Sequence, residues 1–352
     1  MNAPDRAALR LTQFSHGGGC GCKIAPGVLQ QIIAKSSTPI PLPKQLLVGI
    51  ETADDAAVYE INERQAIVAT TDFFMPIVDD PYDFGAIAAT NAISDVYAMG
   101  GTPLFALALV GMPIKELPVE TIRRILEGGE AVCAKAGVPI AGGHTIDSIE
   151  PIYGLVAIGL VDPRNLKRNA GAEPGDALIL GKPLGVGVYS AALRKDRLSA
   201  EGYRIMIAST TQLNTPGIAL GALDAVHALT DVTGFGLLGH LLEICKASNA
   251  AAIVEFARVP LHPQVLALAR DGLFTGASGR NWESYGHAVT LDPALGDAEK
   301  SLLTDPQTSG GLLVACAKRA VEEVLAIFAA QGFAEAAVIG EVAAGTPRVK
   351  VI

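Results

Sequence analysis

The stretch DFGAIAATNAISDVYAMGG, residues 83–101, decides how the chain folds. Small and apolar residues fill it and no proline interrupts it, while Gly100 and Gly101 follow as a stop signal. The stretch therefore predicts one long helix over residues 83–99. Asn91 and Asp95 are unusually polar for a helix of this composition.

Apolar strands flank this helix on both sides. Residues 66–71 predict a strand that ends at Asp72, and the continuous apolar run 104–110 predicts a strand covered on both faces. An amphipathic helix and two further strands follow at residues 121–136, 139–141 and 153–161. This alternation of strands and helices indicates an α/β fold for the first half.

The composition changes between residues 162 and 176, where polar and turn-forming residues make the best domain boundary of the chain. We predict an N-terminal segment at 1–45 and two domains at 46–163 and 170–352. The remaining strands are expected at residues 46–50, 177–180, 251–256, 282–290 (with a loop), 312–316 and 336–339. The remaining helices are expected at residues 24–35, 189–194, 202–213, 217–228, 240–247 and 319–331.

Composition limits the classes of function. Half of the 352 residues are hydrophobic and 18% are charged, which is typical of a globular protein. The net charge of −9 argues against a protein that binds nucleic-acid backbones. Five scattered cysteines, no secretory leader and no apolar run long enough for a bilayer favour a reduced, cytoplasmic protein without a membrane partner.

The segment HGGGCGCK, residues 16–23, is the most unusual of the chain. Its four glycines predict a loop, because glycine loses more backbone entropy than other residues in a helix or strand. Cys20 beside Lys23 suggests a nucleophile whose pKa a nearby cation lowers. A flexible lead with two incidental cysteines is the alternative. The segment is not a Walker A loop, because Lys23 follows Cys22 and precedes Ile24.

Several aspartates stand at or beside the ends of predicted elements, next to small residues: Asp54, Asp55, Asp72, Asp95 and Asp231. Each alone is typical of a cap or a turn. Together they favour a metal–nucleotide site, because Mg²⁺ binds one or two carboxylates plus substrate phosphates. The stretch at residues 142–145, GGHT, is either a nest of N–H donors for a phosphate or a plain turn.

Another motif, GFGLLG at residues 234–239, matches the G-x-G-x-x-G fingerprint, with Glu255 near the spacing of a ribose-binding acid. That fingerprint needs a strand directly before it, whereas the helix-like run 219–228 precedes it here. A nicotinamide or flavin enzyme is therefore a weak alternative. The cysteines and histidines match no zinc spacing, and no G-x-S-x-G elbow is present.

Taken together, the motifs resemble the selenophosphate synthetases (selenide, water dikinases), from about residue 11 to residue 341. The segments that carry the resemblance are HGGGCGCK (16–23), DDAAVY (54–59), TTDFFMP (70–76), ATNAISD (89–95), AMGG (98–101), AGGH (141–144), TDVTGFGLLGH (230–240) and DPQTSGG (305–311). The cysteine-containing segment is the most specific. The aspartate-rich segments and the TDVTGFG segment are shared with the wider superfamily of aminoimidazole-ribonucleotide-synthetase-like ATP enzymes.

The resemblance implies a fold and a reaction. It implies two mixed-sheet α/β (α+β) domains: a first that binds ATP and Mg²⁺, whose sheet pairs across a homodimer into a barrel-like core, and a second α/β sandwich. The reaction would convert ATP, selenide and water into selenophosphate, AMP and orthophosphate, for seleno-tRNA and selenoprotein synthesis. Mg²⁺, with more than one ion, would be required, and K⁺ would be an activator. A transient selenium-delivery protein would be a further partner.

The same resemblance implies roles for individual residues. Cys20 would be the essential catalytic residue that is selenocysteine in many relatives, and Lys23 the essential lysine. The metal ligands would be Asp55, Asp95 and Asp231. The nucleotide contacts would be Lys23, Thr52, Ala53, Asp54, Asp72, Asp95, Gly143, His144 and Thr145. Cys22 receives no role.

These roles agree with the chemistry of phosphoryl transfer, which needs in-line positioning and neutralisation of negative charge. The segment at 16–23 would close over the nucleotide as a lid, mobile without ligand, and bring Cys20 to hold selenium as a thiolate or a selenenyl sulfide. Three other classes stay open: a different ATP enzyme of the superfamily, an oxidoreductase, and a non-catalytic thiol or metal-binding module. The cysteine-containing segment argues against the first, and the carboxylates against the last.

Overall fold

The structure is a computed structural model that describes residues 9–24, 28–29, 32, 42–50 and 53–352. Thr52 and most of the helix predicted at residues 24–35 lie outside the described residues. Within the described part of the chain, no helix combines the length and the apolar character that a membrane crossing needs.

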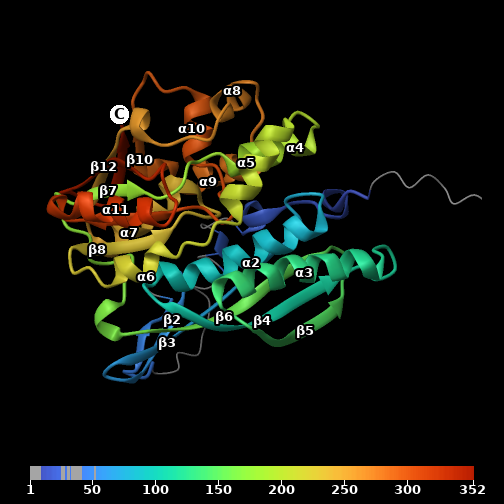
Figure 1. The fold of residues 1–352 in the computed structure, drawn as a ribbon. Helices are drawn as coiled ribbons and strands as arrows, with labels where there is room; N and C mark the ends of the chain where they lie inside the picture. Colours follow the sequence, from blue (N-terminus) through green and yellow to red (C-terminus); the bar gives the residue numbers. More distant parts are fainter. Residues whose placement is uncertain (1–8, 25–27, 30–31, 33–41, 51–52) are drawn as a thin grey trace, which may run out of the picture.

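The first half forms a six-stranded mixed sheet in the order β1-β2-β3-β6-β4-β5. All neighbouring strands pair antiparallel except β4 and β5, which are parallel. The strands are β1 (Leu46–Val48), β2 (Ala57–Asn62), β3 (Gln65–Phe74), β4 (Thr102–Met112), β5 (Ile140–Asp147) and β6 (Ile152–Val161). Two helices, α2 (Pro81–Ala98) and α3 (Val119–Ala136), cover one face of this sheet (Figure 1).

Helix α2 lies between the six-stranded sheet and the second half of the chain, and every residue from Phe84 to Ala98 is buried (Figure 1). Pro81 begins the helix, and the Asp80 side chain accepts a hydrogen bond from the Asp83 N–H at 2.9 Å. At Gly85 a Cβ atom would lie 1.8 Å from the Ile125 carbonyl oxygen of α3. The small residues of α2 thus allow close packing on all sides.

The second half forms a seven-stranded mixed sheet in the order β10-β13-β9-β12-β7-β11-β8. Its strands are β7 (Ala177–Leu180), β8 (Val226–Asp231), β9 (Ala251–Val254), β10 (Val289–Leu291), β11 (Leu312–Cys316), β12 (Ala337–Ala343) and β13 (Arg348–Val351). The helices are α4 (Val186–Arg194), α5 (Ala200–Thr210), α6 (Pro216–Gly221), α7 (Gly236–Ser248), α8 (Val265–Arg270), α9 (Gly276–Tyr285), α10 (Asp297–Leu303) and α11 (Val321–Ala330).

The two halves share a hydrophobic core. Val186, Tyr189 and Met206 of α4 and α5 belong to the same buried cluster as Ile87 and Val96 of α2. The predicted α/β class with two mixed sheets is confirmed. The predicted domains, residues 46–163 and 170–352, meet in the segment that connects the last strand of the first sheet, β6, to the first strand of the second, β7. The division of the chain into independent domains stays a prediction.

Three local predictions were wrong, and some elements were not predicted at all. The helix predicted at residues 217–228 ends at Gly221, and Val226–Asp231 is strand β8, because pairing with β11 outweighs the helix propensity of the alanines. The stretch 142–145 is not a turn but part of strand β5. Trp282 lies in helix α9, where a loop was expected. Helices α8 and α10 and strand β13 had no predicted counterpart.

Candidate active site

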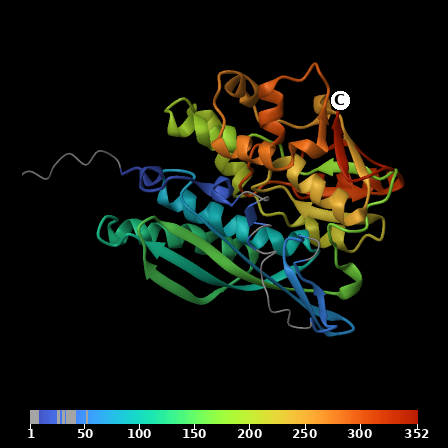
Figure 2. The ribbon, with the colours of Figure 1, turned by 180° about the vertical axis from the view of Figure 1, so that it is seen from behind.

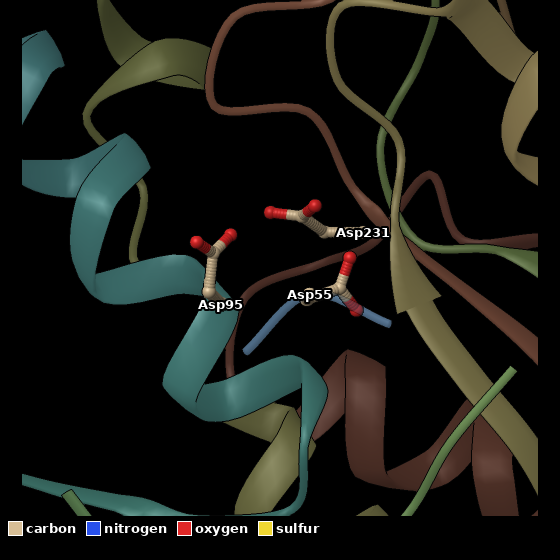
Figure 3. Close-up of side chains that lie close together, drawn as sticks. All are labelled: Asp55, Asp95 and Asp231. Atoms are coloured by element: carbon tan, nitrogen blue, oxygen red, sulfur yellow. The ribbon is translucent and has the colours of Figure 1, made fainter. Parts of the chain in front are cut away.

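Three carboxylates from distant parts of the chain converge where the two halves meet. Asp55 precedes β2, Asp95 lies on α2 and Asp231 ends β8. One ligand oxygen of each lies within 4.8 Å of the others (Figure 3). We call these three residues the acidic cluster. Hard oxygen donors at this spacing can hold a divalent metal ion.

Each carboxylate of the acidic cluster is oriented by a hydroxyl group. The Thr70 hydroxyl donates to Asp95 Oδ2 at 2.5 Å, and the Ser94 hydroxyl donates to Asp231 Oδ2 at 2.5 Å. The Thr230 hydroxyl donates to Asp55 Oδ1 at 2.9 Å. The side chains are therefore held in place by neighbours on β3, α2 and β8.

Burial raises the pKa of all three carboxyl groups above the ordinary value, and the charge of Asp231 adds to this effect at Asp55 and Asp95. Like charges this close repel one another in the folded protein. A bound divalent cation would relieve that repulsion, so the electrostatics and the chemistry of the donor set both fit a metal.

The segment His16–Lys23, which we call the glycine loop, packs against this region and contains a short 3₁₀ helix, Gly19–Cys22. Its backbone is anchored at several points. The Gly19 N–H donates to the Met75 carbonyl oxygen at 2.9 Å, and the Cys20 N–H donates to the Thr308 hydroxyl at 3.0 Å. As a result Cys20 is only 1% exposed.

A chain of side-chain contacts links Cys20 to Lys23. The Cys20 thiol donates to Asn91 Oδ1 at 3.2 Å, and Asn91 Nδ2 donates to Asp72 Oδ2 at 2.7 Å. The same Asp72 oxygen pairs with Lys23 Nζ at 3.2 Å. In the sequence, Asn91 stands out only as a polar residue in a helix of small apolar residues. Its bridging position depends on tertiary contacts that the sequence pattern does not show.

The structure corrects the expected pKa of Cys20. Burial raises the pKa of this thiol well above its ordinary value, and the opposing effect of Lys23 is smaller. Cys20 in this conformation is therefore a neutral thiol rather than an activated thiolate. Burial lowers the pKa of Lys23, but the nearby negative groups, Asp72 foremost, more than compensate and raise it above its ordinary value. The Lys23 side chain is 37% exposed, and water also favours the charged ammonium.

Two glycines of the loop have no room for a side chain. A Cβ atom on Gly18 would lie 2.3 Å from the Pro76 carbonyl oxygen. Gly19 has φ +54, and its Cβ would lie 2.4 Å from the Thr308 hydroxyl oxygen. At Gly21 the nearest atom, in the Pro306 ring, would be 3.4 Å away.

The segment at residues 305–311 supports the loop from the second half of the chain. Thr308 accepts from Cys20, and the Ser309 N–H donates to Asn91 Oδ1 at 2.7 Å. Asp305 accepts the N–H groups of Gly187 and Val188 at 2.9 and 3.3 Å, at the beginning of α4. This segment thus joins the glycine loop, α2 and α4.

Other predicted nucleotide contacts are distributed over two places. A cavity of about 590 Å³ beside β3 is lined by Lys23 and Asp72 together with Phe235 and other apolar residues. Asp54, in contrast, accepts the Asn169 N–H at 2.6 Å, and the Ala53 carbonyl oxygen accepts from Asn169 Nδ2 at 2.8 Å. Both therefore contact the segment that joins the two sheets.

Gly143, His144 and Thr145 are not brought to the acidic cluster within this chain. They lie exposed on β5, at the edge of the sheet, and β4 and β6 separate β5 from β3. Gly142 and Gly143 have φ +148 and +157, and a Cβ atom on Gly143 would lie 2.1 Å from the Ala108 carbonyl oxygen of β4. Close strand pairing therefore explains the glycine at position 143, whereas a Cβ on Gly142 would meet its nearest atom only at 3.9 Å.

The sequence argued against a dinucleotide site at the G-x-G-x-x-G motif because a helix was expected before it. In the structure strand β8 precedes the motif and helix α7 follows it, so that argument no longer holds. Protein atoms nevertheless occupy the space that a dinucleotide would need. A Cβ on Gly234 would lie 2.8 Å from the Cys20 carbonyl oxygen, and one on Gly236 would lie 2.7 Å from Thr304. Strand β8 also pairs antiparallel with its neighbour β11, unlike a βαβ unit.

Both halves of the chain match known protein families. Residues 53–161 match the family described as AIR synthase related protein, N-terminal domain, and residues 173–352 match the corresponding C-terminal domain family. Solved structures share the fold at low identity. A thiamine-monophosphate kinase from Stenotrophomonas maltophilia superposes with a TM-score of 0.64 at 20% identity, over 92% of this chain and 95% of that one.

Curated relatives are much closer in sequence. A selenide, water dikinase from Paraburkholderia xenovorans is 65% identical over 351 residues, which is 100% of this chain and 99% of the relative. One from Pseudomonas straminea is 66% identical over 97% of this chain and 96% of the relative. Identity at this level over the whole length establishes the family: this chain belongs to the selenide, water dikinases, enzymes built on the fold of the AIR synthase related proteins.

Proposed function

We propose that the region between the glycine loop and the acidic cluster is the active site for the family's reaction, in which ATP, selenide and water give selenophosphate, AMP and orthophosphate. The chain of contacts from Cys20 through Asn91 and Asp72 to Lys23 is the observation that carries this proposal. The cation at the end of this chain also interacts electrostatically with Asp95, one of the carboxylates suited to a metal.

Asp55, Asp95 and Asp231 would hold Mg²⁺, and a second ion would share Asp72 or the substrate phosphates. Mg²⁺ bound there would neutralise charge on the phosphate oxygens during transfer. The three hydroxyl groups that orient the carboxylates fix the direction of their lone pairs. K⁺ is proposed as an activator on the strength of the family resemblance alone.

Lys23 and Asp72 would position the nucleotide in the neighbouring cavity. The Lys23 ammonium pairs with Asp72 at 3.2 Å, and it could exchange this partner for a phosphate oxygen. The cavity of about 590 Å³ is within the range of small-molecule sites. Its apolar lining suits the base and ribose, whereas its lysine suits the phosphates. Asp54 and the neighbouring Thr52 and Ala53 would contribute from the adjoining turn.

Cys20 would hold the selenium substrate next to the phosphate that it attacks. The thiol is buried and neutral, so it can donate a hydrogen bond to a selenium anion as it now does to Asn91. A selenenyl sulfide would require an oxidant that this reaction does not supply. We therefore propose a non-covalent role, with the glycine loop as the lid that admits and then covers the substrate.

A homodimer would complete the nucleotide site. Figure 2 shows the six-stranded sheet from behind, where α2 and α3 leave the opposite face uncovered. Large apolar side chains are exposed on β2, β3, β4 and β5 of this sheet, namely Tyr59, Ile61, Phe73, Leu104 and Ile146. Pairing of two such faces would bury them in a barrel-like core. It would also bring Gly143, His144 and Thr145 of one copy toward the site of the other. A cytoplasmic location and a transient selenium-delivery protein remain predictions.

The test is direct. The purified chain is incubated without oxygen with ATP, Mg²⁺ and selenide. AMP is measured by chromatography and selenophosphate by phosphorus NMR. Formation of both, dependent on selenide, is expected. AMP without a selenium–phosphorus signal would point instead to another ATP enzyme of the superfamily.

A further inference from the structure

A second cavity lies against the glycine loop. It has a volume of about 360 Å³, and the loop residues Gly17, Gly18 and Gly21 form one wall. Residues of α4 and of α9, with the turn before α9, form the other walls. The lining shares no residue with the cavity at Lys23 and Asp72.

The charge of this cavity is unusual for a protein with a net charge of −9. Arg194, Lys195 and Arg280 line it together with His16, and no aspartate or glutamate does. Among the described residues, none of the three long cations forms an ion pair with a carboxylate. Nearby acids pair with other groups. Asp79 and Asp196 pair with Arg10 at 2.9 and 3.1 Å, and Glu150 contacts His16 of the cavity lining at 2.9 Å.

Two of these cations also contact the backbone of the loop. Arg194 donates to the Gly17 carbonyl oxygen at 2.7 Å, and Arg280 donates to the Gly21 carbonyl oxygen at 3.1 Å. A guanidinium group has five N–H donors, so each arginine retains donors for another acceptor. Partial burial lowers the pKa of Arg194, as expected for a cation that lacks a carboxylate partner.

We propose that this cavity binds a small inorganic anion on its way to or from the active site. The inference rests on the proposed function, in which hydroselenide enters as an anion while orthophosphate and selenophosphate leave as anions. The acidic cluster repels such species, whereas three unpaired cations beside the loop attract them. Cys20 lies on the same loop that forms one wall of the cavity, between the wall residues Gly18 and Gly21.

The same contacts connect anion binding to movement of the loop. An anion in the cavity would compete with the Gly17 and Gly21 carbonyl oxygens for Arg194 and Arg280. Binding would thus loosen both ends of the glycine loop while charge-assisted hydrogen bonds hold the anion. Such an exchange would let the anion pass when the loop opens.

Calorimetric titration with inorganic phosphate tests binding without turnover. The full chain is used without Mg²⁺ and ATP, so that phosphate cannot bind through a metal at the acidic cluster. Lys195→Glu is the main variant, because Lys195 is exposed and donates no hydrogen bond to the loop in the described structure. It should weaken phosphate binding about tenfold, the size expected for reversal of one nearby charge. Lys350→Glu, on the exposed side of β13, is the charge-matched control and should bind as the wild type does.

Kinetics then distinguish the two sources of anion. If hydroselenide enters here, Lys195→Glu raises KM for selenide about three- to tenfold, with kcat and KM for ATP within twofold of the wild-type values. If orthophosphate leaves here, the variant shows weaker product inhibition by phosphate. Arg280→Gln should change the same quantities in the same direction.

The proposal is overturned if phosphate binding and both kinetic quantities match those of Lys350→Glu, or if binding is lost with no kinetic change. Failure of the proposed function would look different: the wild-type chain would form no selenophosphate, whereas the calorimetry would still decide whether the cavity binds an anion.

Discussion

The acidic cluster and the glycine loop meet at one site, but they are held there by different forces. Asp55, Asp95 and Asp231 extend from the folded core, and each is fixed by a hydroxyl group. The glycine loop offers little side-chain area to bury, so it depends on polar contacts from other elements, among them Met75, Thr308 and Arg194.

This difference predicts opposite consequences for stability. Carboxylates that repel one another destabilise the metal-free fold, so neutralising one should stabilise it. Substitutions in the loop should change docking and chemistry, with little effect on the stability of the core. The predictions below test this separation.

The largest expected effect is on catalysis. Cys20→Ser and Lys23→Ala should each lower selenide-dependent AMP formation at least 100-fold, because they remove the buried thiol and the charge that faces the phosphates. Cys22→Ser is the matched control, since the Cys22 thiol donates to the Gly19 carbonyl oxygen within the loop, at 2.9 Å, and a serine hydroxyl can do the same. It should retain more than a tenth of the activity. Wild-type selenophosphate formation by Cys20→Ser in phosphorus NMR would remove Cys20 from the proposed mechanism.

The next effect concerns docking of the loop. Gly19→Ala places a Cβ 2.4 Å from the Thr308 oxygen at φ +54, whereas Gly21→Ala meets its nearest neighbour at 3.4 Å. Gly19→Ala should therefore lower kcat/KM at least tenfold, and Gly21→Ala less than threefold. Both melting temperatures should stay within about 2 °C of the wild-type value. Equal activities of the two variants would show that the loop need not dock as it does here.

Much of this architecture could be predicted from sequence because local signals agree with tertiary ones. The buried helix α2 and the strands β3 and β4 follow from apolar runs and from Gly100–Gly101 as a stop. Strand β8 could not be predicted, because the alanine-rich run 219–228 that overlaps its start favours a helix, and only pairing with β11 makes residues 226–231 a strand.

The site residues divide in the same way, into those with a local sequence signal and those placed only by tertiary packing. Spacing and residue type, with the family resemblance, suggested the acidic cluster, Cys20 and Lys23. The contacts of Asn91, Arg194 and Arg280 with the loop depend on how three separate elements pack, and no local pattern encodes them.

A third prediction tests the acidic cluster itself. Asp95→Asn should weaken Mg²⁺-dependent ATP binding at least tenfold in calorimetry, because an amide replaces a charged ligand. In the presence of a chelator the same variant should be more stable than the wild type, by about 1 kcal/mol in denaturant unfolding, because one repulsive charge is gone. Glu63→Gln, at an exposed position in the turn between β2 and β3, also removes one negative charge and should change neither quantity. A destabilised Asp95→Asn would mean that the Thr70 hydrogen bond outweighs the repulsion.

The smallest expected effect is on the pH dependence of stability, and it arises at Asp305 in the segment that supports the glycine loop. Burial raises the pKa of Asp305 to about 7, whereas an unfolded aspartate titrates near pH ~4. The folded chain therefore binds this proton more tightly, and the contribution of Asp305 to stability falls as the pH rises from about 4 to about 7.

Asp305→Asn removes that titration, and its amide oxygen can still accept the Gly187 N–H. Its melting temperature relative to the wild type should thus be a few degrees higher at pH 7.5 than at pH 5. Burial lowers the pKa of Lys182 to about 7, so Lys182 also titrates in this range. It does so in both the wild type and the variant, and its effect cancels when their melting temperatures are subtracted. A constant difference across this range would show that Asp305 is already ionised at pH 5, held by the N–H groups at the beginning of α4.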